Sequence, residues 1–496
     1  MSLKIYNSLS RKKEEFISLT KGHVGMYVCG PTVSGESHLG HARPFITFDI
    51  VYRYLVHLGY KVRYVRNITD AGHFEEEGRE AEDKISTKAQ LEKLEPMELV
   101  QKYTNLFHWA MKEFNNTEPS IEPTATGHIV EQISMIKKII DAGYGYVANG
   151  SVYFDVKKYA ASHDYGKLSG RIVEDLLETT RDLEGQEEKR DKADFALWKA
   201  APPAHIMRWE SPWGEGFPGW HIECSAMATK YLGKEFDIHG GGMDLMFPHH
   251  ESEIAQSTIC NHCTPAKYWL HNNMITVNGK KMGKSYNNQI SLTEMFSGSH
   301  PLLTQAFTPM TIRFFILQSH YRSTLDFSSE ALVAAEKGLK RLWDAYTFIS
   351  ATEYPSNVEG IQDTDLDLKI TGLLDELEDF MNDDFNTARV LANLFEIVPV
   401  INSFKDGHLA SNTLSRATFD RVKSSMKIYI ENILGLRSHR EYDEKFNAVI
   451  DLLLEIRKTV RSKKDFLTSD KIRDSLSDAG IIIKDEKDGK MSWEIK

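Results

Sequence analysis

The sequence predicts an α/β protein: a parallel-sheet domain that contains an insertion, followed by an all-α helical bundle and a small C-terminal domain. An apolar run at residues 24–28, an apolar helical stretch at 42–58 and an alternating run at 61–68 have the order and spacing of a strand, a helix and a second strand. Such a unit places its two strands in parallel. After about residue 327, apolar residues recur only with helical spacing.

The same patterns divide the chain into successive segments. We expect residues 1–120 to form the first half of the parallel-sheet domain, 121–194 a connective insertion and 195–327 the second half. Residues 328–440 are expected to form the helical domain, and 441–496 the small C-terminal domain. Periodicity predicts further strands at 236–238 and 268–277, and further helices at 96–114, 126–142, 330–349, 366–381 and 387–404.

Composition and charge limit the class of protein. The chain has 496 residues, with 60 Lys and Arg against 71 Asp and Glu, for a net charge of −11. General nucleic-acid binders are usually basic, but a local basic surface is enough to contact an RNA backbone. No apolar run has the length of a membrane span, and residues 1–19 contain no apolar signal region. We therefore expect a cytoplasmic protein with no membrane partner, and from its acidic, interrupted surface a monomer.

Two short motifs far apart in the chain fit an ATP site. His38 and His41 lie at the start of the predicted helix, where free backbone N–H groups and the helix dipole favour anionic oxygens. Lys281 and Lys284 lie in a Gly- and Asn-flanked loop suited to closing over a phosphate chain. Each motif alone has a plainer interpretation. An H-x-x-H at a helix start is more often a metal pair, a cap or a solvated face, and most lysine loops are solvated turns.

Cysteine, histidine and glutamate residues suggest a metal site. Cys29 follows the first predicted strand, and Cys224 lies in a Gly- and Trp-flanked segment. His249 and Glu253 are four residues apart after a proline that we expect to open a helix, so both face one side of it. Two thiolates, an imidazole and a carboxylate suit tetrahedral Zn²⁺. His250 also faces Glu253, from three residues away, and spacing does not decide between the two histidines.

A second cysteine-rich segment competes with this assignment. Cys260 and Cys263 form a C-x-x-C around His262, which is locally the more conspicuous metal motif. The chain has only 4 cysteines, so no second C-x-x-C completes such a site. We interpret Cys260 and Cys263 as ordinary cysteines.

With these residues in view, the chain resembles the cysteinyl-tRNA synthetase family, a class I aminoacyl-tRNA synthetase family, over nearly its whole length. The motifs at 38–41 and 281–285 match the HIGH and KMSKS signatures of that class. Other matching blocks lie at 26–33, 66–70, 219–227, 239–245 and 247–256, and a block at 383–387 is similar to the start of the helical anticodon-binding domain. The resemblance assigns the zinc ligands to Cys29, Cys224, His249 and Glu253.

The resemblance implies ATP-dependent activation of L-cysteine to cysteinyl-adenylate and its transfer to the 3′-terminal adenosine of tRNA(Cys). Mg²⁺ would accompany ATP. One Zn²⁺ per chain would bind the substrate thiolate, because a steric pocket separates cysteine from serine poorly. The expected ATP-binding side chains are His38, His41, Asp244 and Lys284, with Lys281 in support. Thr69 and Trp220 are candidate walls of the cysteine pocket, although Trp220 is as well explained as a plain core aromatic.

Three departures from the family pattern stand out. Leu39 replaces the Ile of the first signature, Gly283 replaces the Ser of the second, and an acidic excursion at 71–84 interrupts the region after Thr69. That excursion makes the alignment of nearby substrate contacts uncertain.

Other functions stay open at this point. An ATP-dependent ligase that joins cysteine to a small-molecule amine would share the catalytic half but lack the region after residue 327. A non-catalytic, zinc-bearing RNA-binding module would be expected to lose the histidine pair or the lysine loop. A zinc ion that only joins the two halves of the sheet is the structural alternative to a selective one.

Overall fold

The computed structural model describes residues 2–71, 85, 88–89, 94–171, 188–203, 205–283, 286–355, 363–438, 440–479, 481–485 and 491–495. The predicted excursion at 71–84 falls outside these residues apart from Ala71, and so do Lys284 and Ser285. The chain divides into two compact units, Met1–Leu436 and Arg437–Lys496. None of the helices in the described part of the chain combines the length and apolar character of a membrane span.

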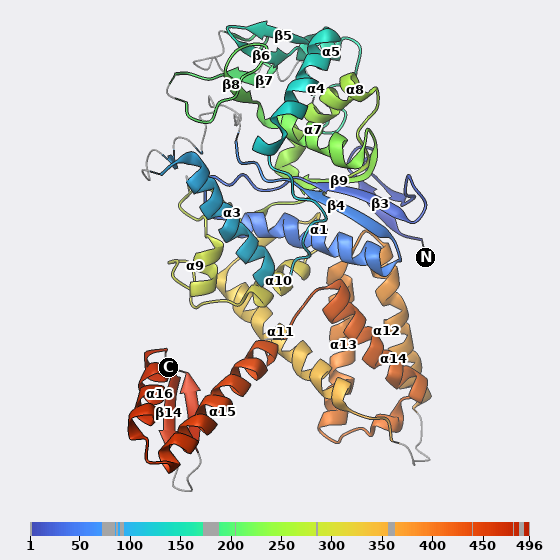
Figure 1. The fold of residues 1–496 in the computed structure, drawn as a ribbon. Coiled ribbons are helices and arrows are strands. Elements are labelled where there is room, and N and C mark those ends of the chain that lie inside the picture. The colour runs from blue at the N-terminus through green and yellow to red at the C-terminus, as the bar shows by residue number, and fades with distance from the viewer. Residues whose placement is uncertain are drawn as a thin grey trace. The chain divides into compact units, whose positions relative to one another are not determined.

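A parallel sheet of four strands forms the centre of the first unit. Its strands are β3 (His23–Val28), β4 (Lys61–Arg66), β9 (Phe236–Gly242) and β10 (Ala266–Asn272), in the order β10-β9-β3-β4 (Figure 1). Every neighbouring pair is parallel. Helix α1 (Leu39–His57) connects β3 to β4, which confirms the predicted strand–helix–strand unit. The strand order reverses between β3 and β9, and ligands of such sheets bind beside this point, at the carboxyl ends.

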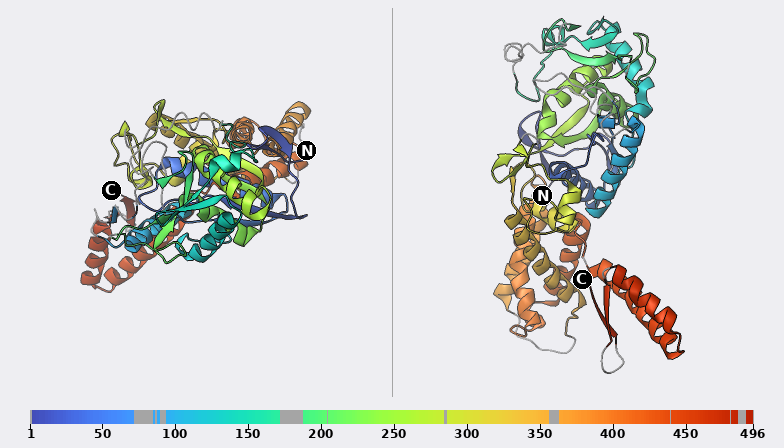
Figure 2. Two further views of the ribbon diagram at one scale, coloured as in Figure 1. Left: turned by 90° about the horizontal axis from the view of Figure 1, so that it is seen from above. Right: turned by 90° about the vertical axis from the view of Figure 1, so that its left-hand side faces the viewer.

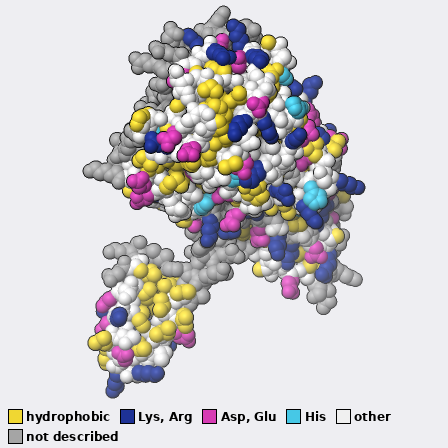
Figure 3. All heavy atoms as spheres, turned by 45° about the horizontal axis from the view of Figure 1, so that its top comes forward, with side chains coloured by type: hydrophobic (Ala, Val, Ile, Leu, Met, Phe, Trp, Pro, Cys, Tyr) yellow, Lys and Arg dark blue, Asp and Glu magenta, His cyan; other side chains and the backbone are white. Residues whose placement is uncertain are grey.

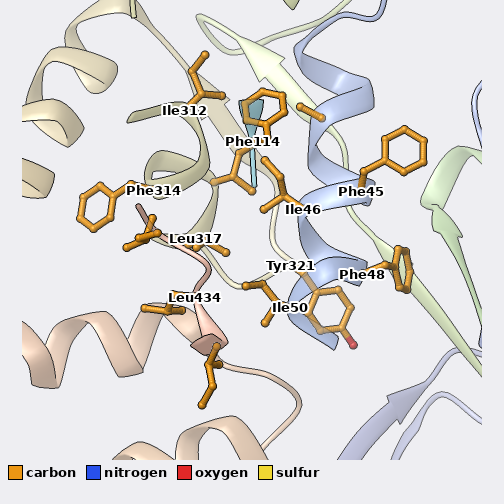
Figure 4. Packing of buried hydrophobic residues seen from close by; sticks show 14 of the residues in the cluster. Phe45, Ile46, Phe48, Ile50, Phe114, Ile312, Phe314, Leu317, Tyr321 and Leu434 are labelled. Atoms are coloured by element: carbon orange, nitrogen blue, oxygen red, sulfur yellow. The ribbon is translucent and has the colours of Figure 1, made fainter. Parts of the chain in front are cut away.

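Helix α1 is covered on two sides, as its strongly apolar sequence requires. Figure 4 shows Ile46 and Ile50 on one side of the helix, toward Leu317 of α10 (Pro309–Leu317), and Phe48 on the other side. Phe48 packs on the sheet, because a Cβ added to Gly240 of β9 would lie 2.2 Å from its ring. The sheet and α10 are therefore packed against opposite faces of one helix.

The insertion forms a separate antiparallel sheet with its own core. It contains β5 (Gly145–Ala148), β6 (Ser151–Phe154), β7 (Phe195–Ala200) and β8 (Gly216–Pro218), in that order. Helix α4 (Ile129–Asp141) lies beside it (Figures 1 and 2). The structure differs here from the prediction that residue 195 resumes the parallel-sheet domain, since β7 pairs with β6. The stretch at 268–277 also differs, because β11 (Ile275–Val277) leaves the parallel sheet and pairs with β13 (Leu325–Phe327).

The region after residue 327 is helical, as predicted. It contains α11 (Ser329–Ala351), α12 (Thr364–Asn382), α13 (Thr387–Lys405) and α14 (Arg416–Lys427). The other elements of the first unit are β1 (Lys4–Asn7), β2 (Lys12–Glu15), α3 (Pro96–Glu113), η1 (Thr126–His128), α5 (Val156–Ala160), α7 (Trp220–Leu232), η3 (Met243–Leu245), η4 (Met246–His250), α8 (Glu251–Asn261), β12 (Lys280–Lys281), α9 (Leu292–Ser297), η6 (Ser411–Thr413) and η7 (Ile428–Ile433).

The second unit is a helical pair with a hairpin. It consists of α15 (Arg440–Ser462), α16 (Phe466–Asp478), β14 (Ile481–Asp485) and β15 (Met491–Ile495). Ile450, Leu454, Leu476 and Ile481 form its buried cluster. The unit therefore has a small core of its own.

Charged side chains of both signs are interspersed on the face of the molecule in Figure 3, in keeping with the net charge of −11.

A buried ion pair joins α1 to α10. Asp49 and Arg313 are 2% and 0% exposed, and Arg313 Nη2 donates to Asp49 Oδ2 at 2.5 Å. Arg53 Nε donates to the same oxygen at 2.7 Å. Arg313 also donates to the carbonyls of Leu434 and Phe114, at 2.8 and 2.9 Å. Burial raises the pKa of Asp49, but the two guanidinium groups outweigh it and lower the pKa below its ordinary value.

We expect Asp49→Ala to lower the free energy of unfolding by about 3–5 kcal/mol, because Arg313 would keep a buried, uncompensated charge. Urea denaturation followed by circular dichroism measures this change. Arg416→Ala is the control, since Arg416 and Asp420 form an exposed pair whose side chains are 70% and 56% accessible. Removal of that pair is expected to cost under about 1 kcal/mol. Equal effects of the two substitutions would contradict the role given to Asp49.

Candidate active site

The amino-terminal end of α1 presents two stacked imidazoles. The ring centroids of His38 and His41 are 3.7 Å apart at an interplanar angle of 20°. The backbone N–H of His38 donates to Nδ1 of His41 at 3.3 Å. Desolvation lowers the pKa of His41 to about 3, with a contribution from the charge of His38. The ring of His41 is therefore neutral near pH 7, and because Nδ1 accepts, its proton lies on Nε2.

Two backbone hydrogen bonds tie the far end of the lysine loop to this helix end. Leu39 N donates to Ile290 O at 3.2 Å, and Leu292 N donates to Ser37 O at 2.8 Å. The near end of the loop also reaches the helix, because a Cβ added to Gly40 would lie 3.8 Å from Met282 Sδ. The two motifs, about 240 residues apart in sequence, are thus neighbours in space.

Lys281 and Asp244, two of the side chains expected to bind ATP, are both exposed. Lys281 is exposed at the end of β12, whereas Lys284 lies outside the described residues, so its place opposite the histidine pair stays a prediction. Asp244 is exposed in η3, directly after β9. Its Oδ1 would lie 2.3 Å from a Cβ on Gly242, so the missing side chain there leaves room for the carboxylate. Desolvation raises the pKa of Asp244 above its ordinary value, and the positive charge of Lys281 offsets part of this rise.

The four predicted metal ligands come from four elements and meet beside the carboxyl end of β3. Cys29 follows β3, Cys224 lies on α7, Glu253 lies on α8, and His249 precedes α8. Their donor atoms lie within 4.8 Å of one another and all four side chains are buried. As predicted, Pro248 opens the helix, because Phe247 is extended and the helical backbone runs from Pro248 through His249 and His250 into α8. The four-residue spacing brings His249 Nε2 to 3.1 Å from Glu253 Oε1.

Burial and mutual charge shift the titration of this cluster. Burial raises the pKa of the Cys29 thiol well above its ordinary value. Burial also raises the pKa of Cys224. The hydrogen bond from Cys29 and the charge of His249 outweigh the effect of burial and lower this pKa to about 6. Burial lowers the pKa of His249, whereas Cys224 and Glu253 raise it to about 10. Burial raises the pKa of Glu253, but the nearby imidazoles of His239 and His249 outweigh it and lower the pKa to about 2. Metals take the deprotonated form of such donors, and burial of unpaired charges would be costly.

His250, the alternative to His249 that spacing left open, also lies in this pocket, and so does His239. His250 Nε2 is 3.3 Å from Cys29 Sγ, and His239 Nε2 is 2.9 Å from Glu253 Oε2. Cys29, His239, His250 and Glu253 form a second buried group with metal-ligating geometry. The predicted set and this second set share Cys29 and Glu253.

Thr69 and Trp220 both lie near the cluster. Thr69 is 2% exposed and donates through Oγ1 to Glu223 Oε1 at 2.5 Å. Burial and the neighbouring Cys224 raise the pKa of Glu223 well above its ordinary value. The Trp220 ring is half-buried, and its centroid lies 4.5 Å from that of His249. Both positions are therefore adjacent to the donor cluster rather than remote in the core.

The competing cysteines lie elsewhere. Cys260 Sγ is 3.6 Å from the Met135 carbonyl oxygen, and Cys263 Sγ is 3.5 Å from the Lys234 carbonyl oxygen. Within the described part of the chain, the groups with metal-ligating geometry contain neither thiol.

Comparison with known proteins agrees with these features. The family described as "tRNA synthetases class I (C) catalytic domain" matches residues 15–337, and the "DALR domain" family matches residues 376–438. The chain is 56% identical over 501 residues to the cysteine–tRNA ligase of Phocaeicola vulgatus, covering 99% of each chain. It is 55% identical over 497 residues to that of Bacteroides thetaiotaomicron, again covering 99% of each.

The chain belongs to the cysteine–tRNA ligase family.

Solved structures with low sequence identity share the fold of this cysteine–tRNA ligase family member. Mycobacterium tuberculosis methionyl-tRNA synthetase, in complex with methionyl-adenylate, superposes with a TM-score of 0.55 at 13% identity, covering 83% of this chain and 89% of that one. At this identity the similarity concerns the fold alone.

The sequence of this family member did not identify several residues that contact the donor cluster. Glu223 and His239 lie in segments that matched the family but had no assigned role, and His250 was considered only as an alternative to His249. Their contacts depend on the packing of α7, β9 and α8. His271 had no local signal, yet its Nε2 is 2.8 Å from His250 Nδ1. Only the strand pairing of β10 with β9 brings it there.

We expect Gly30→Ala to disrupt the site of this ligase family member. A Cβ on Gly30 would lie 1.4 Å from the carbonyl oxygen of Asn67, so the backbone next to Cys29 must move. Overpacking of this kind costs about 1–3 kcal/mol or more. Gly372→Ala on α12 is the control, since its Cβ meets nothing within 4 Å and a helical glycine is replaced by a better helix former. Thermal unfolding should show a lower midpoint for the first variant and an unchanged or higher one for the second. An unchanged midpoint for Gly30→Ala would contradict this account.

Proposed function

We propose that the chain activates L-cysteine with ATP to form cysteinyl-adenylate and transfers the cysteinyl group to the 3′-terminal adenosine of tRNA(Cys). One observation carries the proposal. A buried group of two thiols, an imidazole and a carboxylate lies at the same end of the sheet as the histidine pair of α1. A thiol-selective centre would therefore lie near a site for phosphate oxygens. The full-length similarity to cysteine–tRNA ligases supports the same substrates.

The first step needs positioning and charge stabilisation more than a base. The carboxylate of cysteine is ionised at neutral pH and attacks the α-phosphate of ATP, with pyrophosphate leaving. His38 and His41 would donate hydrogen bonds to phosphate oxygens from the helix end, and the neutral state of His41 suits a donor rather than a counter-ion. Lys284, supported by Lys281, would stabilise the pyrophosphate, and Asp244 would accept from the ribose hydroxyls. Mg²⁺ would accompany ATP.

The donor set fits zinc on chemical grounds. Thiolates and imidazole favour zinc over magnesium or calcium, which prefer oxygen ligands. Cys29, Cys224, His249 and Glu253 would hold one ion, since their donors already lie within 4.8 Å of one another. When bound, zinc supplies a Lewis acid that prefers a substrate thiolate to a hydroxyl.

The side chains around the donors would then orient the substrate. Trp220 packs on His249, and Thr69 is held by Glu223, so both present fixed walls to a small amino acid. The second step needs a ribose hydroxyl of tRNA to reach the acyl carbon at this site.

The helical region favours tRNA over a small-molecule acceptor. A ligase acting on a small amine would need only the catalytic half, whereas this chain continues into α11–α14 and matches the DALR domain over residues 376–438. We assign these helices to tRNA binding.

We expect Cys224→Ser to lower zinc affinity by at least about tenfold, because loss of a ligand costs more than loss of a supporting contact. Zinc content after dialysis at fixed free zinc measures the change. The control is the double substitution of Cys260 and Cys263 by Ser, which should leave zinc content unaltered. The ligand assignment is wrong if the control loses zinc and Cys224→Ser keeps it.

The function is tested by aminoacylation of unfractionated tRNA with labelled cysteine and, in parallel, labelled serine, with and without a zinc chelator. We expect only cysteine to be loaded, and loading to fall when zinc is removed. Adenylate formation without transfer to tRNA would favour the small-molecule ligase. Absence of any cysteine activation by the zinc-loaded protein would overturn the proposal.

A further inference from the structure

Arg43 is a buried charged side chain on α1, two residues after His41. It is 1% exposed. Its Nη1 donates to Met274 O at 2.6 Å, and its Nη2 donates to Ser323 O and, at 3.3 Å, to His320 O. These three acceptors are backbone carbonyls rather than carboxylates. Arg43 therefore holds two backbone segments against the helix instead of neutralising an acid.

The carbonyls that Arg43 binds precede two strands of one small sheet. Strand β11 begins at Ile275, directly after Met274. Strand β13 begins at Leu325, two residues after Ser323. The two strands are parallel, with Ile275 opposite Leu325. One guanidinium group thus fixes the start of both strands against α1.

Strand β11 connects this contact to the lysine loop. It pairs with β12 in antiparallel register, with Thr276 opposite Lys281. The far end of the loop is attached to the same helix, because Leu39 N donates to Ile290 O at 3.2 Å. The loop is therefore fixed to α1 at both ends, at the far end by backbone and at the near end by Arg43 through β11.

We propose that Arg43 is a positioning residue for cysteine activation, which sets the distance between the histidine pair of α1 and the lysine loop. The inference rests on the proposed function, because the two motifs act together on ATP in that reaction. They contact the same phosphate chain from different elements, so their separation decides whether both engage in the transition state. A misplacement of about 1 Å can cost about 100-fold in rate.

The guanidinium group suits this task better than an ammonium group. Its Nη1 reaches the carbonyl before β11 while its Nη2 reaches the carbonyl before β13. A lysine has one nitrogen on a flexible stem and does not reproduce this rigid fork. Burial lowers the pKa of Arg43 to about 10, so the group stays charged near pH 7 and its hydrogen bonds are charge-assisted.

Arg53 provides a matched control on the same helix. Its Nε donates to Asp49 Oδ2 at 2.7 Å, its Nη1 to Asn432 O at 3.2 Å and its Nη2 to Asn115 O at 2.6 Å. It thus makes as many hydrogen bonds as Arg43, to partners outside β11, β13 and the lysine loop. Arg53→Lys removes comparable contacts from α1 without loosening the loop.

Cysteine-dependent exchange of pyrophosphate with ATP by the full, zinc-loaded chain tests the proposal. We expect Arg43→Lys to lower kcat at least about tenfold and to leave the KM for cysteine within about twofold, because the displaced groups act in the transition state. Arg53→Lys should keep both parameters within about twofold of the unaltered chain. Thermal unfolding of each variant establishes that it is folded at the assay temperature.

Asp326→Ala tests the same link without altering the buried guanidinium. The exposed Asp326 carboxylate accepts from Thr276 Oγ1 at 2.6 Å and from Gly279 N at 2.7 Å, so its loss loosens the β11–β12 hairpin with little effect on folding. We expect kcat to fall about threefold or more, again with the KM for cysteine unchanged.

The inference is overturned if Arg43→Lys and Arg53→Lys lose kcat equally, if Arg43→Lys changes only the KM for cysteine, or if Asp326→Ala keeps full kcat. In each of these cases the unaltered chain still activates cysteine, so the proposed function stands. If the unaltered chain shows no cysteine-dependent exchange, the proposed function fails and this inference falls with it.

Discussion

The parallel pairing of β3 with β9 is the contact on which the rest of the site depends. It aligns Tyr27 with His239 and Val28 with Gly240, and the amide of Cys29 donates to the carbonyl of Gly240 at 3.1 Å. Segments more than 200 residues apart thereby end at the same edge of one sheet. Because side chains at the carboxyl ends of neighbouring parallel strands are close in space, this pairing brings Cys29 toward the elements that follow β9.

The same pairing also constrains helix α1. Gly240 has no side chain, and Phe48 fills the space that one would occupy. The helix is thus seated against the sheet, with the histidine pair at its amino-terminal end. Any side chain at residue 240 would push against a buried aromatic ring, so the position of the α1 histidine pair and that of the buried donor group depend on the same backbone contact.

Two groups of buried polar side chains in the first unit differ in what compensates their charge. The carboxylate of Asp49 is neutralised by guanidinium groups, with Arg313 completing its hydrogen bonds on backbone carbonyls. In the cluster around Cys29, the Glu253 carboxylate faces the imidazoles of His239 and His249, and the two cysteines complete the set. Burial of such anions is costly unless cations accompany them, which is the physical reason to expect metal in this pocket rather than packing alone.

The sequence by itself determined the strand–helix–strand unit and the helical region, because these depend on local periodicity. It also indicated the histidine pair at the start of α1, because that motif depends on helix-end chemistry. It further indicated Cys29, Cys224, His249 and Glu253, through their residue types and a resemblance. Only the tertiary structure decided that the strand at 195–200 pairs within the insertion, and that His239, His250 and His271 join the cluster. Strand partners and side-chain neighbours are set by contacts between distant segments, for which local patterns carry no information.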